Sequence, residues 1–181
     1  MNAKTMQEYI THAVVLDVRR RGEQDREISF LSENLGKFKA VLISGSKITS
    51  RFSPQCDVFD YVMIRGVHKN RHTVTDIITE KKYARNFSSI YMRRAFLLAH
   101  FLDKNLPDEV PDNELWRRFV RDCERGELSF SEYLSHLGYG GAHAACARCA
   151  SHNLSAFSFK EQEFLCKSCS SNIPENELLL I

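Results

Sequence analysis

Two pairs of cysteines late in the sequence restrict its fold more than any other feature. Cys146 and Cys149 form one C-x2-C pair, Cys166 and Cys169 form another, and sixteen residues separate the two pairs. Zinc binds four thiolates as a tetrahedron, and a two-residue gap lets one tight turn direct two sulfur atoms at the same ion. Four thiolates leave no coordination position for water. The spacing therefore predicts one structural Zn²⁺ per chain and not a hydrolytic centre.

The residues around these pairs agree with a small zinc module at residues 141–181. Phe157–Phe159 and Glu163–Leu165 predict a hairpin that brings the second pair beside the first. A segment with so few large apolar residues needs metal binding to supply folding free energy. Two alternatives stay open, because either pair could be a redox-active dithiol and the four thiols could also be unrelated. Cys56 and Cys123 lie in apolar patterns and are expected to be buried.

The composition is that of an ordinary globular protein, with 43% hydrophobic and 27% charged residues. The longest apolar stretch, Ala95–Leu102, is far shorter than the roughly 20 residues that a membrane span needs. Residues 1–12 lack the apolar core of a secretory signal. We therefore expect a cytoplasmic protein with no membrane partner, whose cysteines stay reduced.

Alternation of apolar and polar residues predicts strands throughout residues 1–80. Val14, Leu16 and Val18, for example, would share one face of a strand. A set of five short strands suits a small closed barrel, which leaves no exposed sheet edge. The expected strands are His12–Val18, Asp25–Ser32, Lys37–Ser44, Cys56–Arg65 and Thr73–Glu80.

Residues 81–140 show the apolar spacing of helices. Their aromatic residues are interpreted as core and not as a cofactor pocket. The expected helices run from Lys81 to Lys104, from Pro111–Asp112 to Gly126 and from Ser129 to Leu137. The chain is thus expected to be an α+β protein with an N-terminal five-stranded β-barrel, a central helical domain and a C-terminal four-cysteine zinc module.

Basic residues concentrate in one part of a nearly neutral chain. The whole sequence has a net charge of +2, whereas residues 19–51 hold eight basic and four acidic residues. On a small barrel, strands two and three form the usual nucleic-acid face, and cations there would neutralise phosphates. A solvated surface with scattered charge is the alternative. The DNA-binding residues expected from charge are Arg19, Arg20, Arg21, Lys37 and Lys39.

The sequence contains no motif of a common enzyme class. It lacks H-E-x-x-H, G-x-x-x-x-G-K-[ST] and G-x-S-x-G, and its acidic residues form no two-metal cluster. We therefore expect no catalytic activity. Two functions stay open from the residues alone: a DNA-binding protein held by phosphate contacts, or a zinc-stapled adapter that binds protein partners and not DNA.

Several short stretches occur in an order that carries a family likeness. They are Val14–Leu16, Arg20–Asp25, Ile28–Glu33, Gly36–Val41, Gly45–Lys47, Ser50–Phe52, Leu97–Pro107, Leu137–Gly140 before Cys146, and Phe157–Phe159 before Cys166. This ordered set resembles the bacterial RecO family of DNA-repair and recombination mediators, in a short form. The resemblance covers nearly the whole chain.

The resemblance implies an OB-fold at residues 1–80 that binds single- and double-stranded DNA and anneals complementary strands. It implies action with RecR, and sometimes RecF, in the RecF pathway, where RecA is loaded onto DNA covered by single-strand-binding protein. The acidic, hydrophobic C-terminal tail of that binding protein would contact the helical domain at residues 81–140. The resemblance also implies DNA contacts by Lys47 and Arg51, zinc ligation by the four cysteines, and a cytoplasmic protein associated with the nucleoid.

The chain departs from the family pattern in its helices. The helical middle is short, and the sequence ends soon after Cys169, where family members usually have further helices. The tail-binding pocket in particular therefore does not follow from the resemblance. The apolar run Glu177–Ile181 is expected to pack on this chain or on a partner. The sequence leaves open the DNA preference, the oligomeric state, the stoichiometry with RecR and whether RecA loading is retained.

Overall fold

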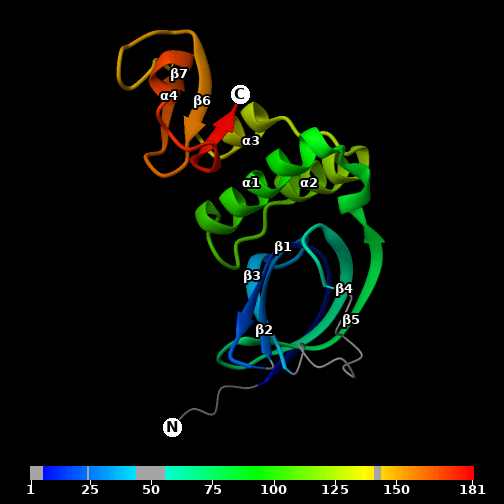
Figure 1. Cartoon of the computed structure of the whole chain (residues 1–181). Coiled ribbons are helices and arrows are strands. Elements are labelled where there is room, and N and C mark those ends of the chain that lie inside the picture. Colours follow the sequence, from blue (N-terminus) through cyan, green and yellow to red (C-terminus); the bar gives the residue numbers. More distant parts are fainter. Residues whose placement is uncertain (1–5, 24, 44–55, 141–143) are drawn as a thin grey trace.

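The protein consists of three layers, a β-barrel, a set of helices and a small three-stranded sheet, stacked in chain order (Figure 1). The computed structural model describes residues 6–23, 25–43, 56–140 and 144–181. No helix within these residues is both long and apolar enough to cross a membrane. The mixed α+β architecture expected from the sequence is confirmed.

The N-terminal layer is a closed barrel with strand order β1-β2-β3-β5-β4. Its strands are β1 (Gln7–Arg21), β2 (Asp25–Ser32), β3 (Gly36–Leu42), β4 (Asp60–His68) and β5 (His72–Lys82). All neighbouring strands are antiparallel except β3 and β5, which pair in parallel at Ala40 with His72 and at Val41 with Thr73. A closed five-stranded barrel of this kind is an OB-fold.

Alternating side chains of the five strands fill the barrel. Apolar residues at every second position of β2 and β3 point inward, as the period-2 pattern predicts. The buried cluster inside the barrel comprises Ala13, Val15, Ile28, Phe30, Phe38, Ala40, Leu42, Cys56, Val62, Ile64, Val74 and Ile77. Cys56 is therefore buried, as expected. Its surroundings raise the pKa of its thiol to about 12, mainly by desolvation.

Four of the five strands, all but β2, have other bounds than expected, and the starts of β1 and β4 differ most. β1 begins at Gln7, earlier than His12, because its first residues pair with the end of β4. The fourth strand begins at Asp60, later than Cys56, because a tight turn precedes it. In that turn the Asp60 backbone N–H donates to the Asp57 carbonyl at 3.0 Å, and Phe59 has a positive φ of 71°. The turn places Phe59 in the core between the barrel and the helices.

The turn between β2 and β3 brings the barrel against the loop that follows the first helix. Gly36 has a φ of +67°, and a Cβ atom there would lie 2.1 Å from the Val110 carbonyl oxygen. Gly22, in the turn between β1 and β2, has nearly the same φ of +68° but has no atom within 4 Å of the equivalent position. The two glycines share a backbone conformation and differ in their surroundings.

This pair gives a matched test of packing at the β2–β3 turn. Gly22→Ala is expected to lower the free energy of unfolding by about 1–2 kcal/mol, because alanine is strained in left-handed backbone. Gly36→Ala is expected to cost roughly 1–3 kcal/mol more, because the Val110 backbone must also move. Urea denaturation of both variants measures the difference. Equal losses for the two variants would contradict the close approach of Val110.

The helical layer contains η1 (Tyr83–Asn86), α1 (Ser89–Asn105), α2 (Asn113–Arg125) and α3 (Phe130–His136). The expectation of one helix from Lys81 was wrong, because β5 stays paired with β4 up to Lys82 and a 3₁₀ turn follows. α1 starts only after Ser88, whose hydroxyl accepts from the Tyr91 backbone N–H. α2 ends at Gly126 with a φ of +71°, as predicted.

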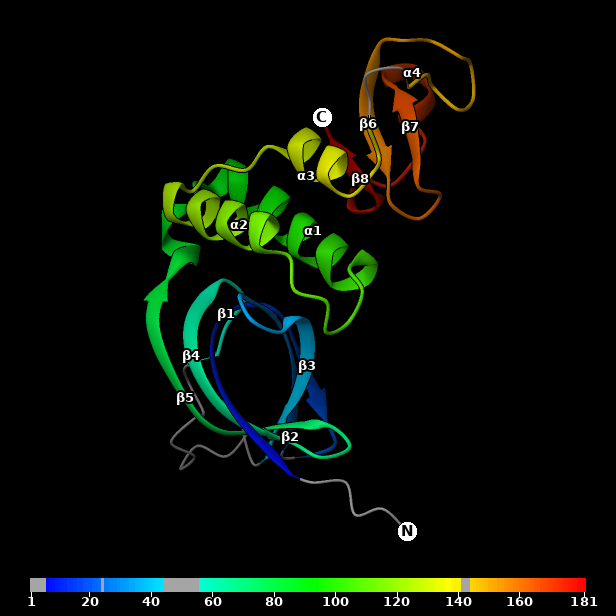
Figure 2. The ribbon, with the colours of Figure 1, turned by 180° about the vertical axis from the view of Figure 1, so that it is seen from behind.

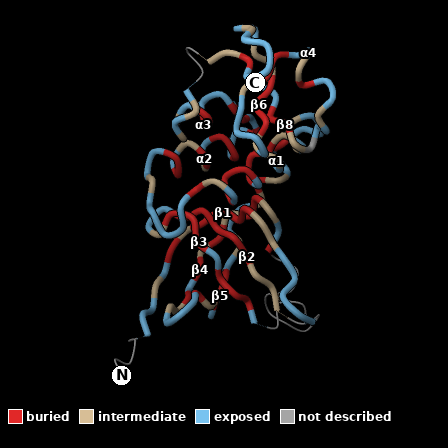
Figure 3. The backbone as a smooth tube through the Cα atoms, turned by 90° about the vertical axis from the view of Figure 1, so that its left-hand side faces the viewer, coloured by how far each residue is buried: buried red, intermediate tan, exposed pale blue. Residues whose placement is uncertain are grey.

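One buried core joins the three layers. It contains Val14 and Leu16 from the barrel, much of α1 and α2, and Phe157 and Leu179 from the small sheet. Figure 2 shows α1 and α2 lying between the barrel and the sheet, and Figure 3 shows buried segments running through all three layers. Most aromatic residues of the helices, such as Trp116 and Phe119, are core residues as expected, whereas Phe96 of α1 is 47% exposed.

The C-terminal layer holds a three-stranded sheet of order β7-β6-β8. Its elements are β6 (Leu154–Ser158), β7 (Glu163–Cys166), α4 (Lys167–Ser170), η2 (Glu175–Glu177) and β8 (Leu178–Leu180). The hairpin of β6 and β7 confirms the prediction. β8 was not predicted as a strand, and it accounts for the apolar run, since Leu178 and Leu179 are buried against the rest of this chain.

Candidate metal centre and nucleic-acid interface

The fold brings all four cysteines of the two C-x2-C pairs together. The sulfur atoms of Cys146, Cys149, Cys166 and Cys169 lie within 4.8 Å of one another, and those of Cys149 and Cys166 are 3.6 Å apart. Zinc–sulfur bonds of about 2.3 Å set neighbouring sulfurs about 3.8 Å apart in a tetrahedron. All four cysteines are free thiols. The donor set and its spacing therefore fit a four-thiolate metal site.

Backbone hydrogen bonds fix the first pair beside the second. The Cys146 N–H donates to the Ser151 carbonyl at 2.8 Å, and the Ala150 N–H donates to the Cys146 carbonyl at 2.8 Å. The Ala147 N–H donates to the Phe164 carbonyl of β7 at 3.0 Å, which ties this turn to the strand that ends at Cys166. The β6–β7 hairpin thus sets the distance between the pairs, as the sequence predicted.

The electrostatics of the four thiols favour a cation at their centre. Hydrogen bonds from backbone N–H groups, first that of Cys166 and then that of Arg148, lower the pKa of Cys146 to about 6. The thiols of Cys166, Cys149 and Cys146 raise the pKa of Cys169 to about 12. Without a cation the four sulfurs cannot all ionise easily. A divalent ion would stabilise four thiolates together.

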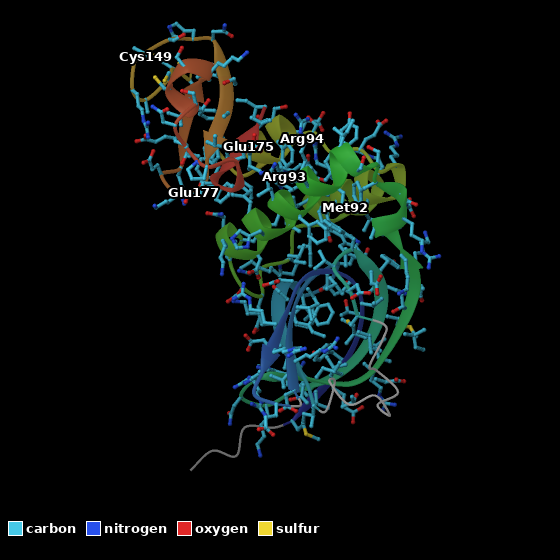
Figure 4. All side chains as sticks on the ribbon, in the orientation of Figure 1. Met92, Arg93, Arg94, Cys149, Glu175 and Glu177 are labelled. Atoms are coloured by element: carbon cyan, nitrogen blue, oxygen red, sulfur yellow. The ribbon has the colours of Figure 1, made fainter. Side chains whose placement is uncertain are left out.

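The sheet around the cysteines is anchored on the helices through Phe157. The Phe157 ring contacts Tyr139 at 5.0 Å and Phe101 of α1 at 5.9 Å between centroids, both edge to face. Gln162 donates to the side chain of Asn105 at the end of α1. In Figure 4 the small sheet and the preceding turn with Cys149 lie above the α1 helix that carries Arg93 and Arg94. A metal at the cysteines would therefore stabilise a surface that α1 needs for packing.

Of the expected DNA-binding cations, Arg19 on β1 and Lys39 on β3 lie on the outside of the barrel, among carboxylates. Ser29 of β2 pairs with Asp17 of β1 on one side and with Lys39 of β3 on the other. Arg19 is exposed, and its Nε donates to Asp17 at 2.6 Å. Lys39 is exposed and forms no ion pair with a described residue. This strip of the barrel therefore has alternating charge.

Arg20 and Arg21 lie at the far end of β1. Arg20 pairs across the strands with Arg26, and Arg26 pairs with Leu42, the last residue of β3. Arg21 is exposed and forms a long ion pair of 3.5 Å with Glu27. Arg20 is exposed and, within the described residues, has no ion pair. The end of the barrel from which β3 leaves thus carries several arginines.

Lys47 and Arg51, which the family resemblance singled out, lie outside the described residues. Their segment follows β3, whose last residue pairs with Arg26. Lys47 and Arg51 stay expected DNA contacts on the resemblance alone.

Lys37 does not belong to the exposed cations. Its side chain is 6% exposed, and its Nζ lies 2.9 Å from Asp108 Oδ1 and donates to the Asp103 carbonyl at 2.9 Å. The expectation that Lys37 contacts DNA is corrected accordingly, because its ammonium is buried between the barrel and the end of α1. Nothing in the sequence near Lys37 indicates that the α1–α2 loop returns to cover it.

Asp103 of α1 is the polar centre of this contact and was not expected as a functional residue. Its carboxylate is fully buried, and it accepts from the Ser29 hydroxyl at 2.5 Å and from Arg19 at 3.3 Å. The two hydrogen bonds connect β1 and β2 to the helix. Arg19 is thus shared between the barrel surface and the barrel–helix contact.

Two further exposed cations lie at the β4–β5 turn and are not among the DNA-binding residues expected from the sequence. β5 runs parallel to β3 with Ala40 beside His72, and Arg71 and Lys39 are the residues that directly precede this pair. Lys69 and Arg71 are both exposed. In OB-folds the loop between strands four and five is one of those that bind oligonucleotides. The OB-fold prediction itself was the signal that could have identified them.

A groove on α1 is the other surface that the sequence did not reveal. It has a volume of about 290 Å³ and is lined by Ile90, Arg93, Arg94, Leu97, Phe130, Glu175 and Leu178–Leu180. Its walls are mainly apolar, and two arginines stand at its edge. Arg93 is paired with Glu175 at 2.5 Å, whereas Arg94 has no ion pair within the described residues. The groove depends on β8, whose pairing with β6 is not local in sequence.

Comparison with known proteins gives a consistent set of relatives. Residues 6–83 match the family described as Recombination protein O N terminal. A DNA repair protein RecO of Thermodesulfovibrio yellowstonii is 27% identical over 178 residues, covering 91% of this chain and 71% of that protein. A DNA repair protein RecO of Rubrobacter xylanophilus is 27% identical over 187 residues, covering 92% of this chain and 73% of that protein. The family match spans the barrel, and the two relatives extend the similarity beyond it.

Proposed function

Because this chain belongs to the RecO family, we propose that it is a non-catalytic DNA-binding protein of DNA repair and homologous recombination. It binds single- and double-stranded DNA, anneals complementary strands and, with RecR and in some settings RecF, helps to load RecA. It acts in the bacterial cytoplasm at the nucleoid. The observation that carries this proposal is an OB-fold barrel with exposed cations at the end of β1 (Arg20 and Arg21), on β3 (Lys39) and in the β4–β5 turn (Lys69 and Arg71).

The proposed DNA surface consists of Arg20, Arg21, Lys39, Lys69 and Arg71, with Lys47 and Arg51 included from the family resemblance. Phosphates would bind these cations and release counterions, so that affinity depends on salt and little on sequence. Asp17 and Glu27 lie among the cations and keep the attraction local. A strand held loosely in this way can still slide and meet its complement, which is what annealing requires.

The cysteine cluster would hold one structural Zn²⁺ per chain. The ion would supply folding free energy to a sheet that has only a small apolar core of its own. It would thereby fix the position of β8 and the shape of the groove on α1.

We assign the α1 groove to the C-terminal tail of single-strand-binding protein. An acidic, hydrophobic tail matches an apolar groove with arginines at its edge, because the apolar side chains would fill the groove and the carboxylates would pair with Arg94. Arg93 would become available if the tail displaced Glu175. This contact would bring the protein to DNA that single-strand-binding protein already covers.

A strand-annealing assay tests the proposal, with bare strands in one arm and strands covered by single-strand-binding protein in the other. The protein is expected to accelerate annealing of complementary oligonucleotides, more strongly at low salt than at high salt. It should also accelerate annealing of strands covered by single-strand-binding protein, and removal of that protein's acidic tail should abolish only this second effect.

The adapter alternative predicts a different pattern. A zinc-stapled adapter that binds only proteins would capture its partner without any gel shift of DNA at low salt. Annealing that is no faster than without protein, in both arms of the assay, would reject the DNA-binding proposal in favour of this alternative.

A further inference from the structure

A second cluster of metal-ligating side chains lies in the barrel, distant in sequence from the four cysteines. His68 ends β4, His72 begins β5, and Glu109 lies in the loop between α1 and α2. One ligand atom from each residue lies within 4.8 Å of the other two. His72 Nε2 is 3.2 Å from Glu109 Oε1, and the rings of His68 and His72 stack with centroids 4.3 Å apart.

Two buried polar atoms at this cluster have no hydrogen-bond partner among the described residues. The His72 side chain is 7% exposed, and its Nδ1 is one of these two atoms. The hydroxyl of Tyr9, whose ring contacts the His72 ring edge to face at 5.2 Å, is also buried and unpaired. A buried polar group without a partner costs about 1–3 kcal/mol. Among the described residues, His72 thus keeps one ring nitrogen that no hydrogen bond occupies.

The backbone holds the three side chains in place. His68 and His72 are paired across β4 and β5 at the end of the hairpin. Glu109 has a positive φ of 59°, and its N–H donates to the Lys37 carbonyl at 2.7 Å. This contact with β3 keeps the Glu109 carboxylate over His72, although the carboxylate itself is 54% exposed. The site is therefore open to solvent on the glutamate side and closed on the His72 side.

We propose that His68, His72 and Glu109 bind a divalent transition-metal ion of the zinc type. Imidazole nitrogens and one carboxylate oxygen suit such an ion, and water would complete its coordination. Two zinc–nitrogen bonds of about 2.0–2.1 Å place the nitrogens about 3.3 Å apart, so that the ligands must approach by up to about 1.5 Å. A turn of the half-buried His68 ring and of the exposed Glu109 side chain supplies this movement.

The ion would join the β4–β5 turn to the α1–α2 loop. Lys69 and Arg71 lie within this turn, so the ion would fix the two missed cations relative to β3 and would add positive charge beside them. The site is separate from the proposed function, because an ion could bind here whether or not the barrel binds DNA.

Metal titration of an untagged, zinc-loaded protein tests the proposal. Starting from protein whose four-cysteine site carries one zinc, calorimetry with micromolar Zn²⁺ and elemental analysis after dialysis are expected to show a second bound ion per chain. His68→Ala and Glu109→Gln are expected to weaken this second site by about tenfold or more, as loss of supporting groups does elsewhere. Neither variant should lose the zinc ion at the four-cysteine site.

His100→Ala is the matched control, because His100 is an exposed histidine on α1 outside both clusters. It should bind two ions like the unaltered protein. Uptake of only one ion by the unaltered protein would overturn the proposal, as would a second site of unchanged affinity in both His68→Ala and Glu109→Gln. Neither result would bear on DNA binding, which is measured separately.

Discussion

Cys166→Ser is expected to abolish stoichiometric zinc binding at the cysteine cluster and to destabilise the chain by several kcal/mol. Structural zinc in small modules contributes apparent binding free energies of about 10–16 kcal/mol, part of which is folding free energy. Cys166 is the last residue of β7 and the N-cap of α4, so the substitution removes a ligand at the junction of two elements. Elemental analysis and thermal denaturation measure the two effects.

Ser168→Ala is the matched control for this prediction. Ser168 lies between Cys166 and Cys169 and is exposed, and its side chain makes no hydrogen bond with a described residue. It should keep one zinc per chain at the cysteines and the stability of the unaltered protein. A Cys166→Ser protein that kept full stability after chelation would show that the four thiols are unrelated to metal binding.

Reversing two charges on the proposed DNA surface is expected to weaken DNA binding strongly. Lys39→Glu/Arg71→Glu should weaken binding to single-stranded DNA on the order of tenfold at low salt and equally for all sequences. The slope of log affinity against log salt should fall by about 1.4, since each phosphate contact on a single strand contributes about 0.7. Fluorescence anisotropy over a salt series gives both values.

Arg117→Glu/Arg125→Glu makes the same change in net charge on a different surface. Both arginines are exposed on α2, and neither pairs with a described residue. If binding depended only on net charge, the two double variants would weaken it equally. A surface-specific loss requires that the α2 variant bind almost as well as the unaltered protein.

Patterns in the sequence were sufficient to predict those elements whose structure depends on residues close together in the chain. β2 was predicted at Asp25–Ser32 and has these bounds, because each alternate residue faces either the barrel interior or its outside. The end of α2 at Gly126 and the hairpin of the zinc module followed in the same way from a single glycine and a short turn.

Contacts between distant segments were the part that the sequence could not supply. The burial of Lys37 depends on Asp108, which comes from a loop more than sixty residues later. β8 exists because β6 offers a free edge, and three leucines in a row carry no strand period of their own. The site formed by His68, His72 and Glu109 was overlooked for the same reason, since its ligands come from a hairpin and from a remote loop.

The aromatic contact between Phe157 and Phe101 of α1 lies between the two proposed binding sites, the cysteine cluster and the barrel. Because one core connects the barrel, the helices and the small sheet, the folded form is a single cooperative state for much of the chain. A ligand that binds only this state stabilises it everywhere. If the cysteine cluster binds metal and the barrel binds DNA as proposed, the two ligands would favour each other under conditions where part of the unligated chain is unfolded, and by thermodynamic reciprocity the effect would be the same size in both directions.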